Sequence, residues 1–409
     1  MATLTTSPAV RTARTEAVSK RSAGVPWYIW CAVLAGTSLM VGGHWDISWH
    51  SSIGRDTFWT PAHMAIYLCG VLAGVAFGYL ILHTTFSRTT PLAAASVHIW
   101  GFRAPLGAFI ASWGGIAMLT SAPFDNWWHN AYGLDVKIVS PPHILLFIGG
   151  YAVLLGTMVL ICGHMNREPK SGAQTAAGSL NTPAVSHRAA YRWLFLYLAG
   201  MMLVMTMVIF MEYTERSALH TALPYVLVCS VTPLILAVGS GVTGARFAAT
   251  HIAGFYMLFV IGLILVLPLF PAQPKLGPVY QNVTHFIPPE FPLLLIVPAF
   301  LLDLFWQKSR DWNAWAKAAI SAAIYVIALV AVEWPFADFL MSPASRNRFF
   351  GTAYLWYGLP PTSYMARNQF FSNGGAAELA SGFLIAFVAA TIVTRWGFAR
   401  AQWFKAIQR

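Results

Sequence analysis

Long runs of apolar residues, separated by short polar segments, are the dominant pattern along the chain. Ten of these runs approach or exceed the ~20 residues that a helix needs to cross the hydrocarbon core of a bilayer. They predict ten membrane-spanning helices, at residues 27–43, 61–83, 105–122, 141–163, 193–211, 222–243, 249–270, 290–307, 314–334 and 376–396. The fold class is therefore expected to be all-α, a multi-pass transmembrane helix bundle.

The composition supports this class. Hydrophobic residues make up 57% of the chain and charged residues only 10%, whereas a soluble domain carries about 25% charged residues. The net charge of +11 would suit nucleic acid, but the cations lie in short loops between apolar runs rather than on one patch. The lipid bilayer is therefore the expected partner, and nucleic acid is not.

The placement of Lys and Arg predicts the orientation. With the amino terminus in the cytoplasm, 18 of the 25 Lys and Arg residues fall inside and 7 outside, which is the bias of inside loops. Both termini are therefore predicted to be cytoplasmic, in a bacterial-type inner (plasma) membrane. The expected organisation is a flexible cytoplasmic tail at 1–26, a four-helix membrane domain at 27–164, a cytoplasmic linker at 165–191 and a six-helix membrane domain of unknown role at 192–409.

An internal repeat occupies two equivalent loops of the first half. Residues 45–64 read WDISWHSSIGRDTFWTPAHM, and residues 124–144 read FDNWWHNAYGLDVKIVSPPHI. The matched pairs are Asp46 and Asp125, Trp49 and Trp128, His50 and His129, Gly54 and Gly133, Asp56 and Asp135, and, after one added residue, Pro61 and Pro141 and His63 and His143. Each copy joins two spans at their outer ends, so a two-helix unit is predicted to occur twice.

The spacing of the first copy favours a metal site. If residues 45–52 continue the preceding helix, Asp46 and His50 lie one turn apart on one face. Pro61 is typical of a first helical position, which places His63 in the first turn of the next span, leaning back toward the other two side chains. One carboxylate and two imidazoles with open coordination positions suit copper, zinc or ferrous iron, and suit magnesium or calcium poorly.

The second copy offers the same set from Asp125, His129 and His143. Any one of these residues alone is more often a hydrogen-bonded interfacial side chain. Their duplication favours a metal site, because charges at membrane depth persist mainly where a partner or a function compensates their cost. Asp56 and Asp135 are open to three interpretations: a fourth ligand, a partner of a neighbouring basic residue or, as we favour, an acceptor that orients a ligating histidine.

The run DISWHSSIGRDTFWTPAH resembles the signature of the C subunit of the copper membrane monooxygenases, the particulate methane and ammonia monooxygenases. In that family Asp, His and a later His bind copper within the membrane, and the matching positions here are Asp46, His50 and His63. A second family site uses Asn, His and His at slightly longer spacing, and the matching positions here are Asp125, His129 and His143. This chain departs from the family by the aspartate in place of the asparagine. The resemblance covers about residues 27–163.

The resemblance implies an enzyme that binds copper near the outer leaflet, activates dioxygen and hydroxylates a small apolar substrate. It also implies further membrane subunits and a cupredoxin-type partner, because the family subunit works beside both and this chain shows no cupredoxin pattern. The alternative is a non-catalytic protein that binds or transports copper or another divalent metal, or an accessory subunit of a membrane complex. Zinc or iron in place of copper stays open.

The second half contains weaker candidates at the outer helix ends. They are Glu212, His220, His285 and Glu290. The segment 288–295 resembles 141–147 with Glu290 in the place of the histidine, so a decayed third repeat is one interpretation. Solvated interfacial charges are the favoured alternative, because the Asp-x3-His pair is missing.

Overall fold

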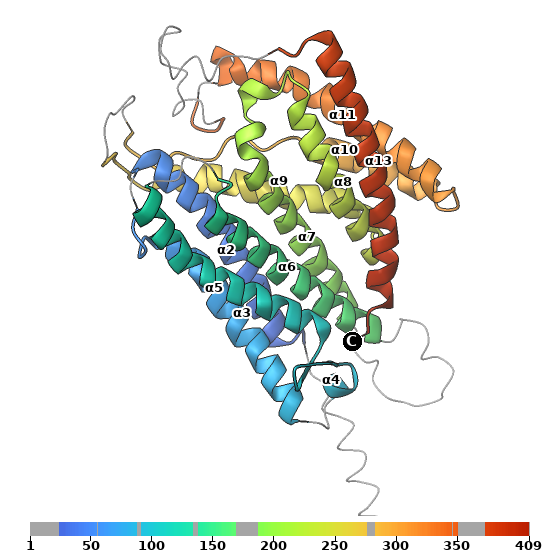
Figure 1. Ribbon diagram of the computed structural model, residues 1–409. Helices are drawn as coiled ribbons and strands as arrows, with labels where there is room; N and C mark the ends of the chain where they lie inside the picture. The colour runs from blue at the N-terminus through green and yellow to red at the C-terminus, as the bar shows by residue number, and fades with distance from the viewer. Residues whose placement is uncertain are drawn as a thin grey trace, which may run out of the picture.

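The computed structural model describes residues 24–54, 56–87, 91–133, 138–168, 187–275, 283–345, 347–350 and 373–408. This part of the chain is almost entirely helical, and the helices pack into one bundle (Figure 1). The principal helices are α2 (Trp27–Ser52), α3 (Pro61–Phe86), α5 (Leu106–Tyr132), α6 (Pro141–Arg167), α7 (Arg188–Phe210), α8 (Leu223–Thr243), α9 (Ala248–Val266), α10 (Ile296–Lys308), α11 (Ala314–Met341) and α13 (Ala376–Ala406). The short pieces are α4 (Pro91–Ala94) and the 3₁₀ turns Met211–Tyr213, Arg216–Ala218, Leu267–Leu269 and Pro343–Ser345.

The one sheet within these ranges is a small antiparallel hairpin between α3 and α5. It consists of β1 (Val97–Ile99) and β2 (Phe102–Ala104). The two turn residues, Trp100 and Gly101, have φ values of 50° and 84°, as a tight hairpin turn requires. The expected all-α class is therefore confirmed, with this hairpin as the exception.

Eight of the described helices are long and apolar enough to cross a membrane. Each of the ten predicted runs overlaps a helix, but α2 and α10 do not meet both conditions. α2 has 26 residues, yet its last turns carry His44, Asp46 and His50, which lower its apolar character. α10 has only 13 residues, fewer than the ~20 that a span needs. The described part of the chain is therefore a multi-pass helical bundle of the membrane type. Eight of its helices are long and apolar enough to span a membrane, whereas the sequence predicts ten spans.

α10 is shorter than predicted because proline interrupts its expected start. The sequence predicts a span over 290–307, whereas the helix begins at Ile296. Three prolines within 288–292 lack backbone donors and disfavour helix in the residues before them. The backbone N–H of Leu294 donates instead to Glu333 of α11. α6 begins directly at Pro141, whereas no helix begins at the matching prolines of 288–295. This difference disfavours the interpretation of 288–295 as a decayed third repeat.

α2 and α13, the first and last of the long helices, both contact the end of α6. The Tyr28 hydroxyl of α2 lies 3.2 Å from Nε2 of His164 in α6. Close by in sequence, the Asn166 side chain donates to the carbonyls of Phe404 and Ile407, at 2.9 and 2.8 Å. Figure 1 shows the carboxyl-terminal end of α13 beside this end of α6.

One continuous hydrophobic core joins the two expected membrane domains. Its buried residues come from helices between α2 and α13, and α7 packs directly against both α2 and α6. α6 continues to Arg167 and α7 begins at Arg188, so both helices enter the range predicted as a linker, 165–191. The second half therefore packs against the elements that carry the repeat.

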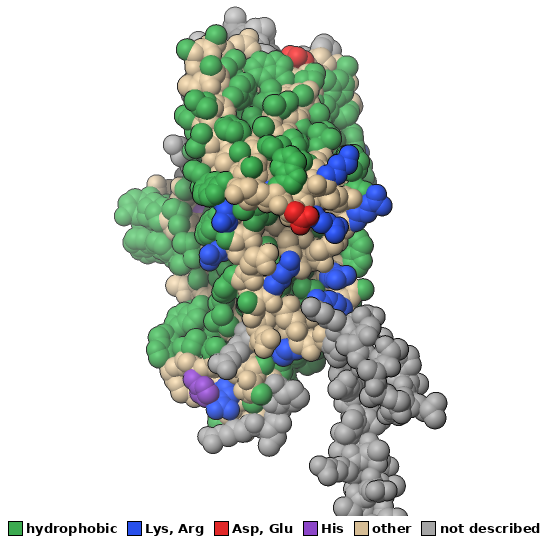
Figure 2. Space-filling model, turned by 90° about the vertical axis from the view of Figure 1, so that its right-hand side faces the viewer, with side chains coloured by type: hydrophobic (Ala, Val, Ile, Leu, Met, Phe, Trp, Pro, Cys, Tyr) green, Lys and Arg blue, Asp and Glu red, His purple; other side chains and the backbone are tan. Residues whose placement is uncertain are grey.

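The outward surface is apolar over the helices, as a lipid-facing surface should be. Leu258, Ile327 and Leu384 are 68%, 68% and 61% exposed. Figure 2 shows apolar side chains over much of the upper part of one face, with Lys and Arg side chains gathered lower down. A lipid bilayer would cover this apolar surface and leave the cations at its boundary.

Paired glycines bring α5 and α6 into close contact. A Cβ added at Gly107 would lie 2.3 Å from the carbonyl oxygen of Gly156, and one at Gly114 would lie 2.5 Å from that of Gly149. Small residues allow such close backbone approach between membrane helices. Because α5 carries Asp125 and α6 begins near His143, this contact sets the distance between the two halves of the second motif.

Candidate metal centre

The first copy of the repeat lies where α2 ends and α3 begins. α2 continues unbroken through Ser52, so Asp46 and His50 stand one turn apart on the same helix, as the spacing predicts. Pro61 is the first residue of α3, and it places His63 in the first turn. The two helices run in opposite directions beside each other, which turns His63 toward the last turns of α2.

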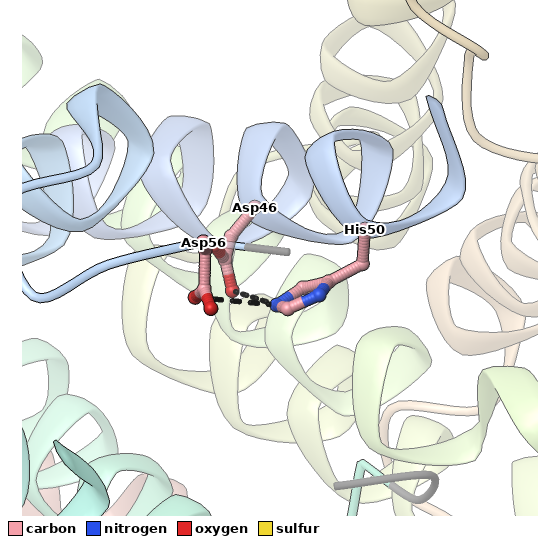
Figure 3. A group of neighbouring side chains, drawn as sticks. All are labelled: Asp46, His50 and Asp56. Carbon is pink, nitrogen blue, oxygen red and sulfur yellow. Dashed lines mark ion pairs between the residues drawn. The ribbon is translucent and has the colours of Figure 1, made fainter. Parts of the chain in front are cut away.

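Three side chains, Asp46, His50 and Asp56, bring their metal-binding atoms together, and His63 lies beside both carboxylates. His63 Nε2 lies 3.1 Å from Asp46 Oδ1 and 2.9 Å from Asp56 Oδ2. His50 Nε2 lies 3.5 Å from Asp56 Oδ2 and 3.8 Å from Asp46 Oδ2. Figure 3 shows both carboxylates facing the imidazole of His50. The His63 contacts have hydrogen-bond lengths, whereas the ligand atoms of Asp46, His50 and Asp56 all lie within 4.8 Å of one another, close enough to hold one metal ion.

The ring of His63 is held in the orientation that a ligand needs. Its Nδ1 lies 2.9 Å from the carbonyl oxygen of Thr57. With Nδ1 donating to that carbonyl, a bound metal would take the place of the proton through which Nε2 contacts Asp46 and Asp56. A backbone or carboxylate acceptor on the other ring nitrogen is the usual partner of a metal-binding histidine.

Asp56 lies among the ligand atoms rather than behind them. It forms, with Asp46 and His50, the one group within the described ranges whose ligand atoms all lie within 4.8 Å of one another. Burial opposes the ionisation of Asp56, but the hydrogen bond from His63 and the charges of His50 and His63 outweigh burial and lower the pKa of this carboxyl. Its side chain is only 8% exposed. The geometry thus favours direct ligation for Asp56 over the orienting role that we favour from sequence.

The second copy repeats the arrangement less tightly. Asp125 Oδ2 lies 3.4 Å from His129 Nε2, and Asp125 Oδ1 lies 3.4 Å from His143 Nε2. Each imidazole faces a different oxygen, so the three residues surround one carboxylate without closing on a single point. Asp135, the counterpart of Asp56, lies outside the described residues. The predicted second site therefore has its three residues together, in a more open arrangement.

The glycine shared by both copies has a structural role in each. Gly54 and Gly133 follow the ends of α2 and α5 with φ values of 95° and 89°, which glycine adopts without strain. In the second copy this turn brings the Gly133 carbonyl to 3.2 Å from His129 Nδ1. The repeated glycine thus ends the helix immediately after its Asp and His pair.

Tyr67 lies between the two copies. It follows His63 by one turn of α3, and its ring centroid is 6.0 Å from that of His63. Its hydroxyl interacts electrostatically with Asp46 and Asp56 of the first copy and with Asp125 of the second. The two sets of ligands therefore lie near each other, as the equivalent placement of the motifs predicts.

The second half of the chain holds the end of α2 in place. Ser48 Oγ donates to the carbonyl of Ile287 at 2.5 Å, and the N–H of Ile287 donates to Ser52 Oγ at 2.7 Å. The N–H of Lys275 donates to the carbonyl of Ile53 at 2.9 Å. Both serines are buried. These contacts fix the turns that carry Asp46 and His50, and no local sequence pattern predicts them.

Glu212 holds the second copy in a similar way. Its Oε1 accepts the backbone N–H of Ile138 at 2.7 Å, and the carbonyl of Ile138 lies 2.9 Å from Nδ1 of His143. A residue that the sequence marks as a weak metal candidate thus contacts the loop that orients a candidate ligand.

We expect Glu212→Ala to weaken metal binding at the second site about 10- to 100-fold, the usual cost of removing an outer partner of a ligand. Glu212→Gln keeps a carbonyl acceptor for Ile138 and should retain most of the affinity. Metal titration of the purified protein measures both. Equal losses in the two variants would assign the effect to charge rather than to the hydrogen bond, and unchanged binding in Glu212→Ala would contradict the positioning role.

The other weak candidates do not gather into a third site. Glu290 accepts from Arg216 Nε at 3.1 Å, and His220 Nε2 lies 3.3 Å from Asp338 Oδ1. His285 shares a hydrogen bond with the adjacent threonine. Within the described part of the second half, these residues form separate pairs and no further group of three ligands.

Comparison with protein-family models, with curated proteins and with solved structures finds no match to this chain. Its class therefore rests on its own fold and side chains. It is an all-α, multi-pass membrane-type bundle with an Asp and His group, at the junction of α2 and α3, that could hold a metal ion.

Proposed function

We propose that this protein is a copper-binding membrane oxygenase that hydroxylates a small apolar molecule with dioxygen. The observation that carries the proposal is the group of Asp46, His50 and Asp56, whose ligand atoms all lie within 4.8 Å of one another, with His63 beside both carboxylates. The resemblance of this segment to the copper membrane monooxygenases supplies the choice of copper and the class of reaction.

The donor set fits a transition metal. Imidazole nitrogens suit copper, zinc and iron, whereas magnesium and calcium prefer sites built from oxygen alone. The fixed Nδ1 of His63 and the low exposure of Asp56 supply an ordered site, while the 41% exposure of the His50 side chain leaves one side open. Copper, when bound, would supply the one-electron chemistry that dioxygen activation requires.

A small apolar cavity supports a small apolar substrate. It has a volume of about 40 Å³, more than the ~10–15 Å³ that one water-sized molecule needs. The lining residues come from α2, α6 and α7: Leu39, Met40, Gly43, His44, Leu146, Phe147, Met205 and Val208. Those on α2 lie within two helical turns of Asp46, and those on α6 lie within two turns of His143. The protein would hold a substrate here away from water, with access from the surrounding lipid.

The reaction would insert one oxygen atom of dioxygen into a C–H bond and reduce the other atom to water. It therefore needs two electrons and two protons from an external reductant, which fits the expectation of a cupredoxin-type or other redox partner. The residues of the chain would position copper, exclude water and bind the substrate.

The test uses membranes that contain the full chain, supplied with copper, ¹⁸O₂ and a reductant. Wild type should convert a short hydrocarbon, alcohol or amine to an ¹⁸O-labelled product, and His50→Ala should not. His83→Ala, on α3 but near the opposite end of the bundle, is the matched control and should retain activity. No labelled product from wild type, together with copper uptake into sealed vesicles, would overturn the oxygenase in favour of a transporter.

A further inference from the structure

A second cavity lies at the end of the bundle opposite the candidate metal centre. It has a volume of about 510 Å³ and is formed where α8, α10 and α13 end and α11 begins. Its walls include Arg246, Asp303, Arg310, Lys317, Phe398 and Lys405. The loops at this end belong to the side that the Lys and Arg distribution predicts to be cytoplasmic.

Four cations surround the cavity: Arg246, Arg310, Lys317 and Lys405. No ion pair with an acidic side chain is found for any of the four within the described ranges. Arg310 and Lys317 are close enough to repel each other, and Asp311 offsets this only in part. Among the described residues, the walls therefore carry more positive than negative charge.

The one carboxylate in the lining is already used. Asp303 accepts from the backbone N–H groups of Ala249 and Thr250, at 3.2 and 2.8 Å, and from the Thr250 hydroxyl at 2.7 Å. These bonds cap the first turn of α9, which would otherwise present free N–H groups. Asp303 thus stabilises a helix end and does not face the four cations as their counter-ion.

Some of the basic side chains are oriented for recognition. Arg246 Nε donates to Gln307 Oε1 at 3.2 Å, and Gln307 donates back to the carbonyl of Arg246 at 2.9 Å. Lys317 Nζ lies over the ring of Phe398, 5.2 Å from its centroid. Planar guanidinium groups bind phosphate oxygens in pairs, and a lysine supplies a point charge beside them.

The helices that form the cavity carry exposed tryptophans. Trp312 of the lining is 50% exposed, and Trp315 of α11 and Trp396 and Trp403 of α13 are exposed as well. Tryptophan gathers at the level of lipid headgroups, and basic pockets between helices on the cytoplasmic side bind phosphate-bearing headgroups. Figure 2 shows Lys and Arg side chains gathered in a band on one face of the molecule, next to apolar surface.

We propose that this cavity binds a phosphate-bearing anion. The charge, the oriented Arg246 and the volume fit a phosphate ester, whose source is either the headgroup of an anionic phospholipid or a soluble phosphate compound. The site is separate from the candidate metal centre and does not depend on the proposed oxygenase activity.

The test is a titration of the purified full chain in detergent with three probes. They are inorganic phosphate, dihexanoyl phosphatidylglycerol and, as a zwitterionic comparison, dihexanoyl phosphatidylcholine. Calorimetry gives the affinity, and the fluorescence of the tryptophans lining the cavity, Trp306 and Trp312, reports occupancy. The variants are Arg310→Gln with Lys317→Gln, the single Lys405→Gln on another wall, and the control Lys308→Gln, an exposed cation at the same end outside the lining.

Binding of phosphatidylglycerol that falls at least tenfold in the double variant and less than twofold in Lys308→Gln would support a lipid headgroup. The same pattern for inorganic phosphate would support a soluble phosphate compound. If the double variant does not fold, a loss of binding in Lys405→Gln gives the same support. Absence of binding by wild type, equal binding of phosphatidylcholine, or binding unchanged in the cavity variants would overturn the proposal.

Discussion

Replacing His63 with alanine should remove the metal from the first site and leave the second site occupied. His63 makes the shorter contacts with both Asp46 and Asp56, at 3.1 and 2.9 Å, compared with 3.8 and 3.5 Å for His50. Without it, two carboxylates face one exposed imidazole, and their mutual repulsion favours separation. Since loss of an outer partner alone costs ~10–100-fold in affinity, loss of this ligand should cost about a hundredfold or more.

Metal content and copper titration of the purified protein measure this effect. Wild type should bind copper at both sites, and His63→Ala should retain only the second. His143→Ala should show the reverse, and His83→Ala, on the same helix as His63, should bind as wild type does. Full copper content in His63→Ala would contradict the assignment of the first site.

Gly114→Ala should destabilise the protein and disrupt the second site alone. A Cβ at Gly114 would lie 2.5 Å from the carbonyl oxygen of Gly149 and 2.7 Å from the backbone nitrogen of Val153. Backbone atoms cannot rotate away, so α5 and α6 must separate, at a cost near the upper end of the ~1–3 kcal/mol typical of overpacking. Asp125 and His129 would then move away from His143, while the α2–α3 site stays in place.

Gly78→Ala on α3 is the matched control, because nothing lies within 4 Å of a Cβ at that position. Alanine there should leave the apparent melting temperature unchanged or raise it, since glycine in a helix costs ~0.5–1 kcal/mol relative to alanine. Thermal unfolding in detergent and copper stoichiometry measure both variants. If Gly114→Ala and Gly78→Ala changed the melting temperature and the copper stoichiometry equally, the close contact between α5 and α6 would not be the cause of the loss.

The local part of the candidate site could be predicted from the sequence. Asp46 and His50 are four residues apart, and helix geometry alone places them on one face. Pro61 starts a helix because its missing N–H costs nothing at that position, and this places His63 in the first turn. The matched spacing in the second copy predicts the same grouping for Asp125, His129 and His143, and the structure brings these residues together.

The role of Asp56 could not be predicted in the same way. It lies in the turn between two helices, where the backbone path depends on Gly54 and on packing, so sequence spacing does not set the direction of its side chain. The sequence favours an orienting role for it, whereas its carboxylate lies beside the imidazole nitrogens that would bind the metal. The shortened α10 has a local cause, the prolines within 288–292, and the contact of the Leu294 N–H with Glu333, 39 residues away, satisfies a backbone group just before the helix.

By itself, the sequence determined the helical class of this protein, the approximate positions of its helices and the residue types of both motifs. These follow from apolar run length, helical periodicity and proline placement, which act within a few turns of the chain. Only the tertiary structure decided that Ser48 and Ser52 are held by Ile287, that Glu212 supports the His143 loop and that four cations meet around one cavity. The physical reason is that these contacts join residues far apart in the sequence, and their geometry depends on how the helices pack rather than on any local pattern.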